Sequence, residues 1–277
     1  MNDIIDIAVG ANHTLVLRED GTVWTSGYNN NGQLGTGDTT NSNIFQKVKI
    51  NDAGEYLKDI IAISANSNSS YALSSNGIVY AWGYNYYGQL GNNTTSNSYY
   101  PVRVQKATNI IQIDSALEYL VMLSSDGSVW SVGYNGYGQF GVNDTSNYRI
   151  PVQMLGTDGK TLYGVKEIST SRNHTMILKE DNTVYTVGYN SYGELGIGST
   201  SYTKTITQVR DSSGRYISDA KHIYATGFSS YITRKDTANG NGQGMYVAGL
   251  NNYNQLFTGN TTQYTKFTQT KNNSNIL

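Results

Sequence analysis

Few side chains in this 277-residue sequence have a type and placement suited to catalysis. Glu118, Glu167 and Glu194 are the carboxylates that break the internal pattern of the chain. Two carboxyl groups facing each other could supply the acid and base of a glycosidase or lyase. The sequence gives these three glutamates no mutual geometry, so a propeller glycosidase or lyase stays a second alternative.

The three histidines are His13, His174 and His222. His13 and His174 occupy the same position of a repeat, where the other copies carry serine or tyrosine, so we interpret them as structural residues whose hydrogen bonds are satisfied. The sequence contains no cysteine, which excludes a thiol nucleophile, a disulfide and a Cys-ligated zinc. We therefore predict that the protein is not an enzyme and has no catalytic residue, metal site or cofactor.

Tyrosine is the most suggestive residue type, with 24 copies in the chain. One series lies four residues after a recurring glycine, in polar loops rich in Asn and Gly, and a further tyrosine adjoins it. Tyrosine combines a large contact area with low rotamer entropy and one hydroxyl group, so it is enriched in binding surfaces. Packing at the rim of the fold is an equally weighted alternative. The predicted binding residues are Tyr86, Tyr87, Tyr137, Tyr192, Tyr253 and, at the same position of the first copy, Asn31.

The elements that position these side chains belong to a repeat. The stretch Gly83-Tyr-Asn-Tyr-Tyr-Gly-Gln-Leu-Gly91 has four relatives, which begin at Gly27, Gly133, Gly188 and Gly249. The copies recur every 50 to 61 residues. A repeat of this length determines the architecture before any single residue does.

Each copy contains the signals of four short strands. A turn with Gly21, Gly77, Gly127 or Asn182 joins two runs rich in β-branched and aromatic residues, as in a hairpin that needs φ > 0. Alternating apolar residues precede the hairpin, and a further strand follows the glycine motif, with proline allowed on an edge. The fifth hairpin, over 235–244, is expected to be longer than the others.

Two series of repeated apolar residues are expected to form the core between neighbouring units. The first lies seven residues after the anchoring glycine: Leu34, Leu90, Phe140, Leu195 and Leu256. The second lies three residues before it: Trp24, Tyr80, Trp130, Tyr185 and Tyr246. On this interpretation, truncation of Trp130 costs roughly 3–5 kcal/mol.

The predicted fold is therefore all-β, a β-propeller built from five repeats of about 50–60 residues, each roughly one four-stranded antiparallel blade. We expect a single domain over 1–277, because no linker or change of composition interrupts the chain. The expected units span 3–50, 59–106, 109–155, 164–210 and 219–271.

The motifs resemble those of a known family. Gly-x-Asn-His-Thr-Leu at 10–15, Asp-Gly-x-Val-Trp at 20–24 and Gly-Tyr-Asn-x-x-Gly-Gln-Leu-Gly at 27–35 resemble the repeat of the regulator of chromosome condensation family. This resemblance, of a bacterial-type member, implies a β-propeller, usually of seven blades. Five repeats leave open a closed five-bladed ring, a ring completed by another chain, or a piece of a longer protein.

Composition restricts the partners. The net charge is −1 and only 14% of residues are charged, so we expect no binding to nucleic acid. No signal peptide and no apolar run of about 18 residues is visible, so no membrane span is expected. The localisation is then cytoplasmic by default, although the Asn/Tyr/Thr/Ser-rich composition also suits a bacterial or phage surface protein. The oligomeric state stays open.

Three functions follow. The favoured one is a non-enzymatic recognition scaffold that binds a protein or a cell-surface glycan through Tyr/Asn-rich loops on one face. The alternative, implied by the resemblance, is a regulator of a small GTPase similar to a guanine-nucleotide exchange factor. The exchange activity of the founding members depends on elements outside the repeat consensus, and no residue here matches them. The second alternative is the propeller enzyme considered above.

Overall fold

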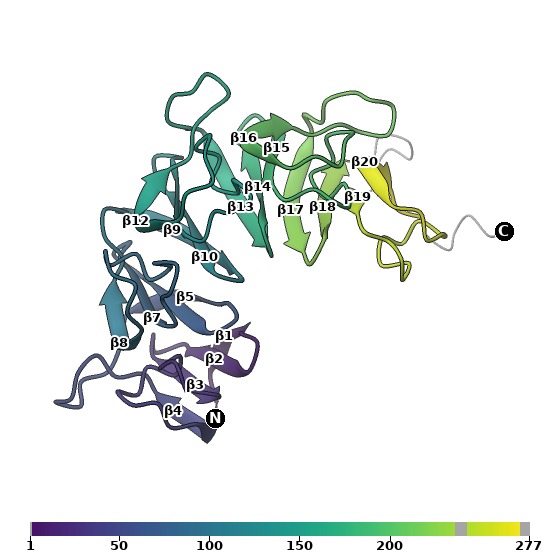
Figure 1. Ribbon diagram of the computed structural model, residues 1–277. Helices are drawn as coiled ribbons and strands as arrows, with labels where there is room; N and C mark the ends of the chain where they lie inside the picture. Colours follow the sequence, from purple (N-terminus) through teal and green to yellow (C-terminus); the bar gives the residue numbers. More distant parts are fainter. Residues whose placement is uncertain (1, 236–242, 272–277) are drawn as a thin grey trace. The chain divides into compact units, whose positions relative to one another are not determined.

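The computed structural model describes residues 2–235 and 243–271, and these residues form twenty β-strands and no helix (Figure 1). The strands make five four-stranded antiparallel sheets in which sequential strands are neighbours. The fold is therefore all-β, a β-propeller of five four-stranded blades, as the repeat predicts. No described residue belongs to a helix long and apolar enough to cross a membrane. The predicted long hairpin lies mostly at 236–242, outside the described residues.

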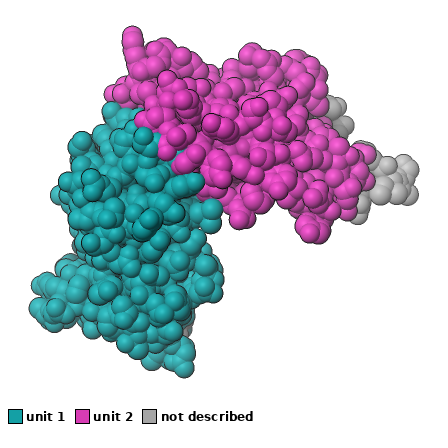
Figure 2. Space-filling view, in the orientation of Figure 1, with its two compact units in different colours: residues 1–135, 146–153 teal, residues 136–145, 154–277 magenta. Residues whose placement is uncertain are grey.

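The chain divides into two compact units, coloured separately in Figure 2. Unit 1 comprises Met1–Asn135 and Ser146–Gln153, and unit 2 comprises Gly136–Thr145 and Met154–Leu277. The strands of unit 1 are β1 (Ile4–Val9), β2 (His13–Arg18), β3 (Val23–Gly27), β4 (Ser42–Lys47), β5 (Ile60–Ala65), β6 (Ser69–Ser74), β7 (Val79–Gly83), β8 (Ser98–Arg103), β9 (Ile110–Ala116), β10 (Tyr119–Ser124), β11 (Val129–Gly133) and β12 (Tyr148–Gln153). Those of unit 2 are β13 (Val165–Ser171), β14 (His174–Lys179), β15 (Val184–Gly188), β16 (Thr203–Gln208), β17 (Ala220–Thr226), β18 (Ser229–Lys235), β19 (Gln243–Gly249) and β20 (Tyr264–Gln269).

The hairpin turns have the predicted backbone. Gly21, Gly77 and Gly127 have φ between 72° and 78°, and Asn182 replaces glycine with φ of 65°. In the first turn, Thr22 donates from its backbone N and its hydroxyl to Oδ1 of Asp20, at 3.0 and 2.6 Å. A short polar side chain therefore fixes the turn that places β2 beside β3.

The last strand of each blade is an edge strand, as the prolines suggested. Pro101 lies within β8, the outer strand of the sheet β5-β6-β7-β8. A proline is tolerated there because its missing N–H faces no further strand.

The core lies between consecutive blades. In unit 1, Leu15 and Leu17 of β2 pack with Ile60 and Ile63 of β5 and with Ala72 of β6. An equivalent cluster in unit 2 joins β14 to β17 and β18. The predicted core residues seven positions after the glycine have no exposed surface: Leu34, Leu90, Phe140, Leu195 and Leu256.

The aromatic residues three positions before the glycine are less buried than the sequence suggested. All five are half-buried. Tyr80, Trp130 and Tyr246 pack against the inter-blade clusters from the outside. They extend the core to the surface.

Candidate functional site

A buried asparagine shapes each glycine-motif loop. In the second blade, Oδ1 of Asn85 accepts a hydrogen bond from Leu90 N at 2.9 Å. Its Nδ2 donates to the carbonyl oxygens of Thr94 and Ser96, at 3.1 and 2.9 Å. Gln89 Oε1 accepts from Tyr87 N at 3.1 Å. These bonds replace the missing secondary structure and hold the tyrosine at the loop tip.

The same loop is built five times. The asparagine two positions after the anchor is fully buried in every copy: Asn29, Asn85, Asn135, Asn190 and Asn251. The sequence interpretation did not assign a role to this asparagine. The recurrence of this asparagine in all five copies indicates a structural role, because the fold does not require asparagine at a position where the side chain is solvated.

In unit 1, four tyrosines form an aromatic row, which we call row 1: Tyr84, Tyr86, Tyr87 and Tyr134. Tyr87 contacts Tyr134 of the next blade edge-to-face, with ring centroids 5.0 Å apart. Tyr86 contacts Tyr87 at 5.0 Å and stacks with Tyr84 at 6.4 Å. Tyr86 is 65% exposed, so row 1 is both packed and accessible.

Unit 2 contains a second row, which we call row 2: Tyr137, Tyr189, Tyr192 and Phe228. Tyr137 contacts Tyr189 at 4.9 Å, and Tyr192 contacts Phe228 at 4.9 Å. The Arg172 guanidinium lies 4.3 Å from the centroid of the Phe228 ring, a cation–π distance. Sequence reasoning missed Phe228, which stands where other copies have Asn12, Asn68 and Asn173.

The structure does not bring all the predicted residues together. Tyr253 is 87% exposed and has no ring contact with another described aromatic residue. Asn31 is half-buried, and its Oδ1 accepts from Asn97 Nδ2 at 3.1 Å. The predicted tyrosines therefore fall into the two rows, with Tyr253 and Asn31 outside them.

Two carboxyl groups lie close to the rows. Gln89 Nε2 donates to Oε2 of Glu118, and burial raises the pKa of Glu118 to about 7. Glu194 has no exposed surface, and burial raises its pKa to about 7 as well. Its Oε2 accepts from Tyr192 N at 2.8 Å, whereas its Oε1 has no hydrogen-bond partner among the described residues.

Glu167, the third candidate acid, is engaged elsewhere. Its carboxylate lies 3.2 Å from His222 Nδ1 and accepts from Ile223 N at 3.0 Å. These contacts join β13 to β17 and explain the glutamate as a link between neighbouring blades. Within the described residues, no group of three or more His, Asp or Glu side chains could hold a metal ion.

His13 and His174 are buried and join neighbouring blades, a structural role that the sequence suggested, but the ring of His13 is not fully satisfied, because its Nδ1 has no partner among the described residues. Each Nε2 lies 3.0 Å from the hydroxyl of a serine on the next blade, Ser70 and Ser230 respectively. Burial lowers the pKa of both histidines to about 4, so both rings are neutral at pH 7.

Fold and loops together define a propeller protein that is assembled from glycine-motif repeats and presents aromatic loop residues. The family model described as RCC1-like domain matches residues 1–276, and the chain belongs to that family.

Related proteins differ widely in length. The chain is 40% identical over 215 residues to the human X-linked retinitis pigmentosa GTPase regulator, covering 76% of this chain and 20% of that protein. It is 30% identical over 209 residues to the ultraviolet-B receptor UVR8 of Arabidopsis thaliana, covering 75% of this chain and 46% of the receptor. The chain thus spans about a fifth of the first relative and less than half of the second.

Solved structures agree on the fold. Human WBSCR16 superposes with a TM-score of 0.79 at 18% identity, covering 97% of this chain and 67% of that one. Prp20p of Saccharomyces cerevisiae superposes with a TM-score of 0.60 at 20% identity, covering 98% and 77% of the two chains.

Proposed function

We propose that this protein is a non-enzymatic recognition scaffold whose aromatic rows bind a partner protein. The observation that carries the proposal is the half-exposed packing of the tyrosines at the loop tips. Edge-to-face contacts hold Tyr87 against Tyr134 and Tyr137 against Tyr189, so the rings are ordered before a ligand arrives. Pre-ordered aromatic side chains lose little entropy on binding, which favours affinity.

A glycan is the alternative ligand for the same rows. A tyrosine ring offers an apolar face and a hydroxyl group to a sugar as well as to a peptide. The area available favours a protein, because each row combines several neighbouring rings, and aromatic residues dominate the binding energy of protein interfaces.

A small GTPase is the particular partner that the relatives suggest. The name of the human relative describes a GTPase regulator, and the matched region covers 76% of this chain. The relative is about five times longer than the matched region, so its activity transfers here only as a proposal.

The test places a photo-crosslinking phenylalanine analogue at position 86. The same analogue at Tyr163, which is 53% exposed and lies outside both rows, serves as the control. A protein crosslinked from position 86 but not from position 163 is then purified, and its affinity is measured by calorimetry. We expect Tyr86→Ala with Tyr137→Ala to weaken this affinity at least about tenfold, while a cooperative thermal melt shows that the variant is still folded.

Two further binding assays decide among the ligands. Panels of purified small GTPases and of glycans are applied to the wild type and to the double variant. If a glycan binds the wild type and this binding is lost in the double variant, the ligand of the aromatic rows is a sugar and not a protein. Equal affinity of the purified partner for the wild type and the double variant would overturn the role of the rows.

A further inference from the structure

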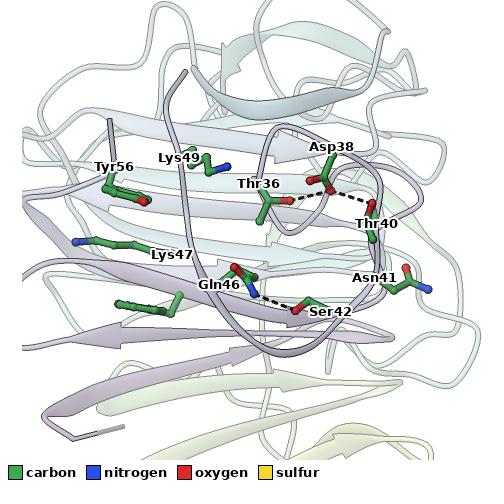
Figure 3. A pocket seen from close by; sticks show the side chains of 10 residues that line it. Thr36, Asp38, Thr40, Asn41, Ser42, Gln46, Lys47, Lys49 and Tyr56 are labelled. Carbon is green, nitrogen blue, oxygen red and sulfur yellow. Dashed lines mark hydrogen bonds between the residues drawn. The ribbon is translucent and has the colours of Figure 1, made fainter. Parts of the chain in front are cut away.

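A pocket on the first blade is separate from the aromatic rows (Figure 3). Its volume is about 520 Å³, within the range of small-molecule sites. The lining comes from β3, β4 and the segments that flank β4: Trp24, Thr36, Asp38, Thr40, Asn41, Ser42, Gln46, Lys47, Lys49 and Tyr56.

Two aromatic rings form one part of the lining. Trp24 is half-buried, and its Nε1 donates to Thr22 Oγ1 at 3.1 Å, which fixes the indole. Tyr56 is 43% exposed, and Lys47 Nζ lies 4.9 Å from its ring centroid. Fixed rings with one open side suit the apolar C–H face of a sugar.

Hydroxyl, amide and carboxylate groups form another part, to the right in Figure 3. Asp38 Oδ1 accepts from Thr40 N at 2.9 Å and from Thr36 Oγ1 at 3.2 Å. No hydrogen bond joins Asp38 Oδ2 to another described residue, so this oxygen can accept from a ligand hydroxyl. Gln46 Nε2 reaches Ser42 Oγ only at 3.5 Å, so this amide has donor capacity to spare.

The pocket also contains two cations. Lys47 and Lys49 are half-buried, and neither forms a salt bridge with a described residue. Lys47 contributes to lowering the pKa of Asp20, so part of its charge acts on that carboxylate. Lys49 forms no salt bridge with a described residue, so its ammonium group is available to an anion.

The second blade has a different residue at one of the lining positions. Gln105 stands at the position of Lys49, and its Nε2 donates to the carbonyl oxygen of Asn92 at 3.1 Å. Tyr56 belongs to a segment between blades that the sequence after Val104 lacks. The first blade therefore differs from the second at residues that line the pocket. A residue that only supports the shared fold could be the same in both blades, so this difference favours a role in binding.

We propose that this pocket binds a sugar unit that carries a carboxylate. One face of the sugar stacks on Trp24 and Tyr56, its hydroxyl groups donate to Asp38, and its carboxylate accepts from Lys49. A polyphosphate fits less well, because it has no hydroxyl to donate to Asp38 and no apolar C–H face to stack on Trp24 and Tyr56. The site is independent of the aromatic rows, so it does not depend on the proposed protein partner.

The test measures binding of three methyl glycosides, those of galacturonate, glucuronate and N-acetylneuraminate, by ligand-observed NMR. Their uncharged methyl esters serve as matched probes, and inorganic phosphate is tested alone. We expect at least one acid to bind the full chain about tenfold more tightly than its ester, and added salt to weaken that binding.

The key variant is Lys49→Gln, which installs the residue of the second blade and is compatible with a blade of this design. We expect it to reduce the affinity for the acid about tenfold with an unchanged melting temperature. Lys221→Gln, on β17 and outside the pocket, should bind as the wild type does. The proposal is overturned if no acid binds at millimolar concentration, if the esters or phosphate bind equally well, or if Lys49→Gln binds unchanged.

Discussion

A β-carbon built on Gly196 would lie 2.2 Å from Cε2 of Phe267, on the last strand of the next blade. Gly196 also has φ of 64°, in the left-handed region. Both conditions require glycine, the first because the blades approach closely and the second because of the backbone. In the fifth copy the equivalent residue is Phe257, which has φ of 55° and is 57% exposed.

Gly196→Ala should therefore destabilise the protein by about 3 kcal/mol, the sum of left-handed strain and overpacking. Gly159→Ala is the control for strain alone, because Gly159 has φ of 77° and no atom within 4 Å of the added carbon. We expect it to cost about 1 kcal/mol. Denaturant unfolding measures both costs, and equal costs would show that the contact with Phe267 relaxes freely.

Ile63 and Ile7 form a second matched pair, since they hold the same repeat position on β5 and β1. Ile63 is 8% exposed and packs between the first two blades, whereas Ile7 is 59% exposed. We expect Ile63→Ala to cost about 3 kcal/mol and Ile7→Ala no more than about 0.5 kcal/mol. Chemical melts of the two variants give the comparison. A large cost at Ile7 would mean that its face is covered in solution.

The fold was predictable because its signals repeat. Five co-registered copies locate each strand, and even the asparagine at position 182 obeys the φ > 0 requirement of its turn. The half-burial of Trp130 was not predictable, because an aromatic residue at the margin of a core recurs as regularly as one in its centre.

The candidate site was predictable only in part. The tyrosine series pointed to the loop tips, but edge-to-face pairing of Tyr87 with Tyr134 depends on distances between blades that the sequence does not contain. The pocket beside Lys49 was missed entirely. It arises from residues that depart from the repeat, and a departure alone does not reveal which side chains converge.

The two buried histidines make stability depend on pH on the acid side. The pKa of His13 and of His174 is lowered to about 4 in the folded state, against 6.5 for an exposed histidine. The unfolded chain therefore binds more protons between pH 6.5 and 4, and stability falls as the pH falls through this range. Each histidine accounts for up to about 3 kcal/mol of this loss. His13 Nδ1 has no partner among the described residues to stabilise an added proton.

The double variant His13→Gln, His174→Gln isolates this effect. Its free energy of unfolding should fall less between pH 6.5 and 4 than that of the wild type, whatever the cost of the substitutions at pH 7. Urea melts at several pH values measure the difference. Parallel pH profiles of the variant and the wild type would contradict the burial of neutral histidines.

Glu194 should act in the opposite direction. Burial raises the pKa of Glu194 from 4.5 to about 7, so the folded state holds a proton that the unfolded chain releases between these values. The contribution of protonated Glu194 to the free energy of unfolding is fully present below about pH 4.5 and is lost as the pH rises through about 7.

The variant Glu194→Gln removes this loss, because the amide that stands at this position in four of the five copies does not ionise. We expect the variant to gain about 2 kcal/mol over the wild type between pH 4.5 and 8, measured by urea unfolding. Glu118→Gln should shift the profile in the same direction, since burial also raises the pKa of Glu118 to about 7. A constant difference between Glu194→Gln and the wild type over this range would mean that Glu194 is already ionised in the folded protein, paired with a cation or reached by water.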